Sequence, residues 1–133
     1  MSATVSQYFA LLEQRERYRM LFHAFFRHVD VLVTPVTVTS AFTHISDEIP
    51  LVRRTIQVNG SMVPYTFLPV YAGLATYSGL PATVFPWAKT RLGLPLGLQV
   101  IGPYLEDRTA IMFAWLLERE FGGFTPPADY SSE

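Results

Sequence analysis

The chain has four side chains that could do acid–base or metal chemistry: three histidines and one lysine. His23 and His28 stand five residues apart in one predicted helix, whereas histidines that share a metal on a helix typically stand four apart. We therefore interpret both as structural. His44 lies near Asp47 and Glu48 in a predicted loop. A metal or acid–base site is one interpretation of that cluster, and a solvated loop is the favoured one.

Lys89 is the only lysine of the chain, and it falls in a predicted polar loop at 87–91. Water there keeps its amine protonated and a poor base. The chain also has no Gly-x-Ser-x-Gly elbow, P-loop, dinucleotide fingerprint or His-Glu-x-x-His motif. Because these residues do not assemble a nucleophile, a base and an oxyanion hole, we expect no catalytic residue in this chain. We also expect no metal and no cofactor.

The first half of the chain predicts one long helix, a strand and a hairpin. A helix over 6–29 has an apolar face at helical spacing, formed by Leu11, Tyr18, Leu21, Phe22, Phe25 and Val29. The β-branched run at 31–34 predicts a buried strand that Pro35 ends. Residues 36–55 lack periodicity and predict a loop. Asn59-Gly60 is a type I′ turn signal, which predicts a hairpin over 55–65.

The second half predicts a helix, two strands and a last helix. The helix covers 66–78, with Pro69 in its first turn. Gly-Leu-Pro occurs at 79–81 and again at 93–95, and each copy opens an apolar run, at 82–85 and 96–101, that predicts neighbouring strands of one sheet.

The last predicted helix begins at Asp107 as its N-cap and ends at Gly122-Gly123. Its apolar face has helical spacing and comprises Ala110, Phe113, Ala114, Leu117 and Phe121. An extended tail is predicted from Pro126 to the end of the chain.

Composition favours one globular domain over 1–133 that lacks part of its surroundings. The net charge of −1 gives no electrostatic case for a nucleic-acid or anionic-membrane partner. Charged residues make up 16% of the chain, against about 25% in ordinary globular proteins. We infer that something else covers part of the surface, and a merely apolar small domain is the alternative. Without cysteine, a secretory leader or a membrane-spanning run, a cytoplasmic location is expected.

Four pieces of the chain, taken in order, resemble the amidase signature family. Each piece alone is modest, but their order and spacing make the resemblance specific, and together they cover nearly the whole chain. The pieces are FFRHVDVLVTP at 25–35, AFTH at 41–44 with the hairpin residues VNG at 58–60 and PY at 64–65, GLPATVFP at 79–86, and GLPLGLQVIGP at 93–103 followed by EDR at 106–108.

The resemblance implies an α/β fold: a partial mixed β-sheet flanked by helices, forming the C-terminal piece of the family's α/β/α fold. Family members hydrolyse amide bonds with a Ser–cis-Ser–Lys triad that lies in their N-terminal half. This chain has no Gly-Gly-Ser-Ser-Gly-Gly-like stretch, and Lys89 does not stand in the context of the triad lysine. The resemblance therefore implies scaffold and pocket wall, without a catalytic residue.

In family members that act on hydrophobic amides, the helix before the first Gly-Leu-Pro walls the acyl pocket. The resemblance thus implies that Leu68, Tyr71 and Ala75 line a substrate pocket. Their spacing of i, i+3 and i+7 places them on one helix face. Plain core packing is the alternative for all three.

We expect this chain to be the C-terminal fragment of an amidase, inactive alone, with a small-molecule amide as substrate only in the complete enzyme. One alternative is a non-catalytic module that self-associates as a homo-oligomer or pairs with a separate N-terminal amidase half. Another is a fragment without a physiological role. None of these hypotheses includes nucleic acid or a membrane as partner.

Overall fold

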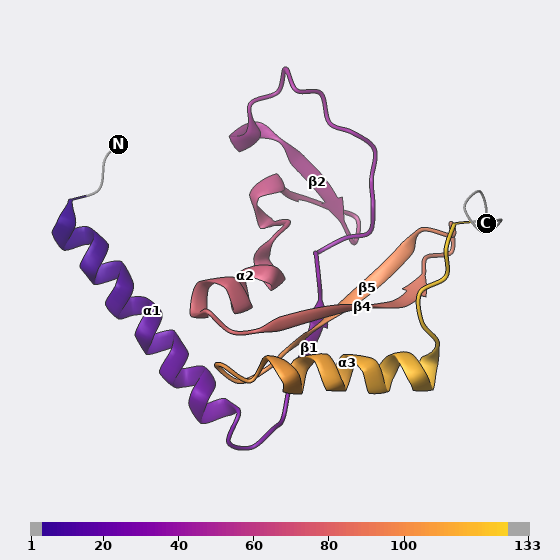
Figure 1. The fold of residues 1–133 in the computed structure, drawn as a ribbon. Coiled ribbons are helices and arrows are strands. Elements are labelled where there is room, and N and C mark those ends of the chain that lie inside the picture. The colour runs from indigo at the N-terminus through magenta and orange to yellow at the C-terminus, as the bar shows by residue number, and fades with distance from the viewer. Residues whose placement is uncertain (1–3, 128–133) are drawn as a thin grey trace.

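The computed structural model describes residues 4–127, so the start of the chain and the end of the predicted tail, at 128–133, lie outside these residues. The elements in order are α1 (Val5–Phe25), β1 (Leu32–Pro35), η1 (Leu51–Arg53), β2 (Thr55–Val58), β3 (Ser61–Pro64), η2 (Tyr65–Phe67), α2 (Val70–Ser78), β4 (Ala82–Lys89), β5 (Pro95–Ile101) and α3 (Asp107–Phe121), where η denotes a short 3₁₀ helix (Figure 1).

β5 is the central strand of a three-stranded sheet, with β1 and β4 paired antiparallel on its two sides. Ile101 at the end of β5 stands opposite Leu32 of β1 and Ala82 of β4. The predicted pairing of the two strands that follow the Gly-Leu-Pro copies is therefore confirmed. Val100 and Ile101 are wholly buried, since helices cover both faces of the sheet at this point.

The core forms two clusters on opposite faces of this sheet, because successive strand residues point to opposite sides. Val100 packs on the α3 face with Phe85, Ala110 and Ala114. Ile101 packs on the face covered by α2 and the end of α1, with Ala75 and Leu80, and with Phe22 and Phe26 at the margin. The result is the predicted layering of helices on both sides of a sheet (Figure 1).

α1 begins with a capping box and ends earlier than predicted. The Gln7 N–H donates to the Thr4 hydroxyl at 3.2 Å, and the Thr4 N–H donates to the Gln7 side chain at 2.9 Å. The helix ends at Phe25 and not at Val29. The N–H groups of residues 27 and 28 donate to carbonyls three residues earlier, at 3.4 and 3.1 Å, and form a turn in place of a further turn of α-helix.

The face that α1 turns toward the body differs from the predicted face. No residue of α1 is buried. The half-buried positions follow a 3, 4, 3, 4 spacing and run into the turn after the helix: Leu12, Arg15, Arg19, Phe22 and Phe26. Of the predicted stripe, only Phe22 belongs to this set, and the others are 40–66% exposed. Apolar spacing alone does not reveal this face, because two of its members are arginines, whose aliphatic stems pack against neighbouring side chains.

The predicted hairpin is confirmed as β2 and β3. Asn59 and Gly60 have φ angles of 49° and 83°, the positive values that a type I′ turn requires. The Tyr65 N–H donates to the Arg54 carbonyl at 2.9 Å and closes the base of the hairpin. The hairpin projects away from the three-stranded sheet (Figure 1). The predicted loop before it is irregular except for η1.

The predicted helix over 66–78 consists of two separate pieces. η2 comes first, Pro69 follows at the N-cap position, and α2 begins only at Val70. Proline lacks an N–H, so it suits a helix start, where that donor would have no partner. Its carbonyl accepts the Gly73 N–H at 2.8 Å. Gly79 ends α2 with a left-handed φ of 67°.

β4 is longer than predicted, because it continues to Lys89 and not only to Phe85. A β-bulge between Pro86 and Ala88 interrupts its ladder with β5. Proline is tolerated there because β4 is an edge strand of this sheet. The connecting loop is only 90–94, and the Thr90 N–H closes it with a bond of 2.8 Å to the Leu94 carbonyl.

α3 begins one residue earlier than predicted. Asp107, the predicted N-cap, is its first helical residue, and Glu106 holds the N-cap position without a side-chain cap bond. Ala110 and Ala114 are buried, as the predicted apolar face requires. Phe121 departs from that face and is 61% exposed, since it lies at the last position of the helix. Gly122, with a φ of 97°, ends α3.

The chain exposes more surface than a compact molecule of its mass. Its accessible surface is 10465 Å². A compact monomer of 15.0 kDa exposes about 7,000 Å², so this surface is larger by about half. A body that packs the chain from outside would explain the excess, in line with its low content of charged residues.

Candidate functional site

The three predicted pocket residues lie along the start of α2 and differ in exposure. Leu68 precedes Pro69 and is half-buried, as is Tyr71 in the first turn. Ala75 is only 5% exposed and packs against Leu80 and Ile101. Leu68 and Tyr71 therefore have surface to offer a ligand, and Ala75 contributes mainly to the core. Their role as a pocket wall stays a prediction.

Gln99 fixes the start of α2 to the sheet. Its side chain is nearly buried, with 3% of the residue exposed. Its Nε2 donates to the Thr34 hydroxyl on β1 at 2.8 Å and to the Tyr71 carbonyl on α2 at 2.8 Å. A buried amide with both donors satisfied is a rigid link, because breaking either bond leaves a polar group without a partner. The candidate pocket wall therefore follows the position of β1 and β5.

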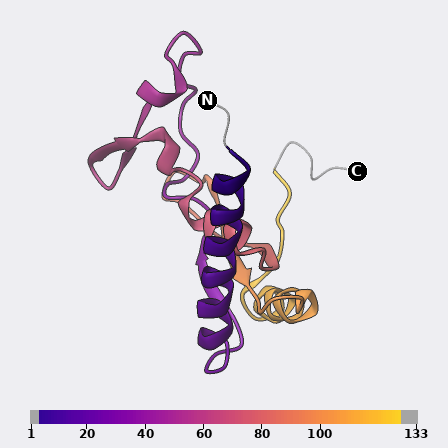
Figure 2. The ribbon, with the colours of Figure 1, turned by 90° about the vertical axis from the view of Figure 1, so that its left-hand side faces the viewer.

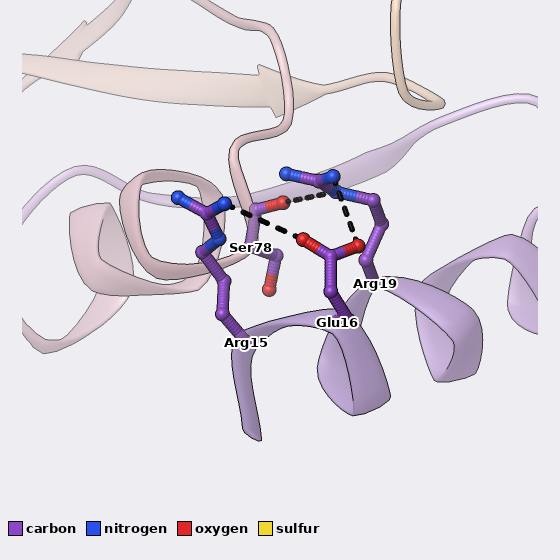
Figure 3. Close-up of polar contacts among 4 residues, drawn as sticks. All are labelled: Arg15, Glu16, Arg19 and Ser78. Atoms are coloured by element: carbon purple, nitrogen blue, oxygen red, sulfur yellow. Dashed lines mark hydrogen bonds and ion pairs between the residues drawn. The ribbon is translucent and has the colours of Figure 1, made fainter. Parts of the chain in front are cut away.

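Arg19 fixes the other end of α2. Its Nε donates to the Ser78 carbonyl at 3.1 Å, and its Nη1 lies 3.0 Å from the Glu16 carboxylate (Figure 3). Arg15 contacts the same carboxylate at 3.4 Å. Ser78 is the last residue of α2, where carbonyls lack helical partners and the helix dipole favours a cation. The guanidinium of Arg19 thus holds α2 against α1.

The surroundings of Arg19 leave little room for change. Its guanidinium carbon lies 4.1 Å from the centre of the Tyr104 ring, a cation–π contact. A β-carbon at Gly79 would come within 2.9 Å of its Nη2. Glycine is therefore favoured at 79 by the left-handed backbone, and a larger residue would also displace this guanidinium.

A hollow of about 360 Å³ opens at Pro35, the last residue of β1. The irregular segment 35–41 forms one side, and Trp87 with residues 95–98 forms the other. Gly97 lets β5 lie close to β4 beside this hollow, because a β-carbon at 97 would lie 3.3 Å from the Phe85 carbonyl oxygen. The volume is within the range of small-molecule sites. The sequence predicts only a loop for this segment.

Trp87 also lines a second hollow, of about 320 Å³, between the β4–β5 hairpin and the end of α3. Its ring lies 5.1 Å from that of Phe121, edge to face. Lys89 is at the rim of this hollow and is exposed. It stands on a strand, in contrast to the predicted loop, but in the solvated setting that was expected.

The remaining titratable candidates do not come together as a site. His23, His28 and His44 are all exposed. Asp47, predicted as a possible partner of His44, is instead paired with Arg54 at 3.2 Å. Within residues 4–127, no group of three or more histidine, aspartate or glutamate side chains is placed to hold a metal ion.

Lys89, the one lysine, cannot activate Ser78, which is the one buried serine within residues 4–127. Ser78 is 2% exposed and ends α2, just before the start of β4. Lys89 ends β4, and the seven-residue rise from Ala82 spans about 23 Å. A Lys–Ser pair needs hydrogen-bond contact between the two side chains. Ser78 and Lys89 therefore do not form such a pair.

Sequence reasoning missed both residues that hold α2. Gln99 left a signal, since it is the one polar residue in the otherwise apolar run at 96–101. Buried polar side chains in strands usually make a specific bond. Arg19 left no such signal, because a charged residue in an amphipathic helix is by default placed on the wet face.

Comparison with known proteins identifies the family of this chain. The family model described as Amidase matches residues 1–111. The chain belongs to the amidase family. It is 32% identical over 103 residues to a subunit of the glutamyl-tRNA(Gln) amidotransferase of Rhizobium etli, which is 77% of this chain and 19% of that protein. It is 39% identical over 64 residues to fatty-acid amide hydrolase 2-A of Danio rerio, covering 48% of this chain and 12% of that one.

A solved amidase has the same fold over this part of its structure. It superposes with a TM-score of 0.73 and 26% identity, covering 90% of this chain and 26% of the amidase. The predicted family and fold class are confirmed. The chain thus spans about a fifth of the Rhizobium etli subunit and a quarter of the solved amidase. Within residues 4–127, no helix combines the length and apolar character needed to cross a bilayer.

Proposed function

We propose that this chain is the C-terminal portion of an amide hydrolase of the amidase family. In this proposal it supplies sheet strands, flanking helices and part of the substrate pocket. The complete enzyme hydrolyses the C–N bond of a small-molecule carboxamide. The match of 90% of the chain to only 26% of a solved amidase is the observation that carries the proposal. The excess accessible surface of the chain supports it.

In this proposal the catalytic groups of the complete enzyme lie outside this chain. In the family the chain resembles, a serine attacks the amide carbonyl, an amine or ammonia leaves, and water releases the acid. Such a step needs a serine activated by a base and donors for the oxyanion. The proposal places all of these in the other portion, so the chain alone has no hydrolase activity.

The part of the site that this chain contributes is the α2 wall. Leu68 and Tyr71 are proposed to contact the acyl side of the substrate, with Ala75 behind them. Gln99 and Arg19 support this assignment because they hold the two ends of α2 in place. A pocket wall must keep its shape to position a reacting carbonyl. We propose the cytoplasm as the compartment, which suits a chain without cysteine.

A chimera tests the function. The matched quarter of the solved amidase is replaced by this chain, and release of ammonia or amine from aliphatic and aryl amides is measured. We expect the chimera to hydrolyse at least one amide and the isolated chain to hydrolyse none. Turnover by the isolated chain would contradict the assignment of the nucleophile to the other portion. A folded chimera without turnover on any amide would contradict the proposed function.

A non-catalytic module is the second candidate, and the exposure of α1 favours it. No residue of this 21-residue helix is buried. Such a module would persist as a homo-oligomer or pair with a separately encoded amidase portion. Light scattering over a range of concentrations separates the candidates. A stable homo-oligomer that the other amidase portion does not dissociate would favour the module.

A further inference from the structure

α1 carries a second apolar surface beside the face that contacts the rest of the chain, and the two meet at Tyr18, whose ring lies 5.4 Å from that of Tyr77 on α2, edge to face. We call it the outer stripe, and it consists of Leu11, Tyr18, Leu21 and Phe25. These side chains are 41–66% exposed. Successive members are 7, 3 and 4 residues apart, and Gln14 fills the position between Leu11 and Tyr18 on the same face. This spacing keeps the four side chains on one face of the helix. Figure 2 shows α1 nearest the viewer, with no described element in front of it.

The outer stripe includes a shallow, open patch with the spacing of a helix-packing site. It is lined by Gln7, Ala10, Leu11 and Gln14. These positions are i, i+3, i+4 and i+7, the four residues that form a hole for a knob side chain of a facing helix. Ala10 is small, and Leu11 is apolar. The stripe contains no charged residue, so it fits an apolar partner surface.

α1 is part of the amidase fold and not an added segment. The family model matches residues 1–111, which include the whole of α1. The superposition on the solved amidase leaves 10% of this chain unmatched, which is less than the length of α1. That amidase has about three-quarters of its chain outside the matched part. A complete copy of this fold therefore also contains that outside part.

We propose that a helix from the part of the amidase body outside this chain packs along the outer stripe and inserts an apolar knob between Gln7 and Gln14. This inference rests on the proposed function, because it takes the partner to be the rest of an amidase. α1 is about 31 Å long, enough for several turns of a facing helix. Covering it also removes part of the excess accessible surface.

Calorimetric titration tests the interface. The chain is titrated with the solved amidase from which the matched quarter has been removed. Leu11→Glu places a charge in the outer stripe, and we expect it to weaken binding at least tenfold. Ile111→Glu on α3 is the matched control, because Ile111 is also an aliphatic helix residue and is also 54% exposed. We expect the control to bind within twofold of the unmodified chain.

Leu11→Gln gives a milder change that keeps helix propensity, and circular dichroism verifies that each variant is folded. An intermediate loss of affinity with Leu11→Gln supports the proposal. Three results overturn it: no binding by the unmodified chain, equal weakening by both glutamate variants, or a homodimer that Leu11→Glu dissociates while binding of the amidase portion is unchanged.

The two proposals fail in different ways. If the chimera hydrolyses an amide but Leu11→Glu binds normally, the interface is wrong and the function stands. If Leu11→Glu abolishes binding but the chimera hydrolyses no amide, the function is wrong and the interface stands.

Discussion

At position 99 an amide stands where the strand pattern calls for an apolar side chain. Replacing Gln99 with Leu removes both donors and leaves the Thr34 hydroxyl and the Tyr71 carbonyl with one partner fewer. We expect a loss of about 1–3 kcal/mol in the free energy of unfolding, measured by urea denaturation. Gln57→Leu is the control, because Gln57 is exposed on β2. A similar loss in both variants would refute the special role of Gln99.

The second prediction at this scale concerns two glycines with positive φ. Gly60→Ala introduces backbone strain alone, since nothing lies within 4 Å of the added carbon, and we expect it to cost about 1 kcal/mol. Gly79→Ala adds a clash with the Arg19 guanidinium, so its cost should be larger. The same denaturation assay compares the two variants. Equal costs would show that the guanidinium moves aside without loss.

Single residues were predictable where their chemistry is local. The φ angles of Asn59 and Gly60 follow from the turn signal, because only two residues and their own backbone decide it. The bond between Gln99 and Tyr71 joins residues 28 apart in sequence, and no local pattern encodes such a partner. The arginine at 19 was unpredictable for the same reason, since its acceptor is 59 residues away.

Among the elements, α2 is short, at nine residues, and depends on contacts at both ends. Helices of this length are marginal in isolation. Arg19→Met keeps the aliphatic stem but removes the cation and the donor to Ser78. We expect faster amide hydrogen exchange in the last turn of α2 and a loss of about 1–2 kcal/mol in stability.

Arg17→Met is the control for this prediction. Arg17 is exposed on the same helix, so its replacement should leave exchange in α2 unchanged. Faster exchange in both variants would attribute the effect to α1 as a whole and contradict a direct bond. Hydrogen exchange with mass spectrometry resolves the two elements.

The order and type of the elements followed from periodicity and turn residues, whereas their lengths did not. β4 exceeds its predicted length because residues 86–89 gain a partner in β5, and the local sequence there, with a proline at 86 and a lysine at 89, gave no sign of it. The helix before it divides at Pro69, since the residues on either side adopt different hydrogen-bond patterns. In both places tertiary pairing and proline geometry overrode the local propensity.

For the whole molecule, the excess surface predicts the response to denaturant. The slope of unfolding free energy against urea scales with the surface exposed on unfolding. Because the folded chain already exposes about half again the surface of a compact monomer, we expect a slope below that of compact domains of equal length. Equilibrium unfolding monitored by circular dichroism measures it. A slope typical of a compact domain would show that the chain buries its apolar surface in solution.

The family and the layered fold were predictable at this scale because the matching pieces occur in order along nearly the whole chain. The face by which α1 meets the body was not, since apolar spacing marks two surfaces and cannot say which one the same chain covers. Phe22 contacts the sheet cluster, whereas its neighbour Leu21 is exposed, so one step along the helix separates the two surfaces.

The bulge at Pro86 has a consequence for how this chain behaves in solution. β4 is an eight-residue edge strand, and such an edge offers peptide groups on which further copies can stack into fibres. Pro86 has no N–H to offer, and the bulge beside it bends the ladder. An incoming strand can therefore pair along only half of this edge. We therefore expect the chain to stack into fibres less readily than an unbroken edge strand of this length would allow.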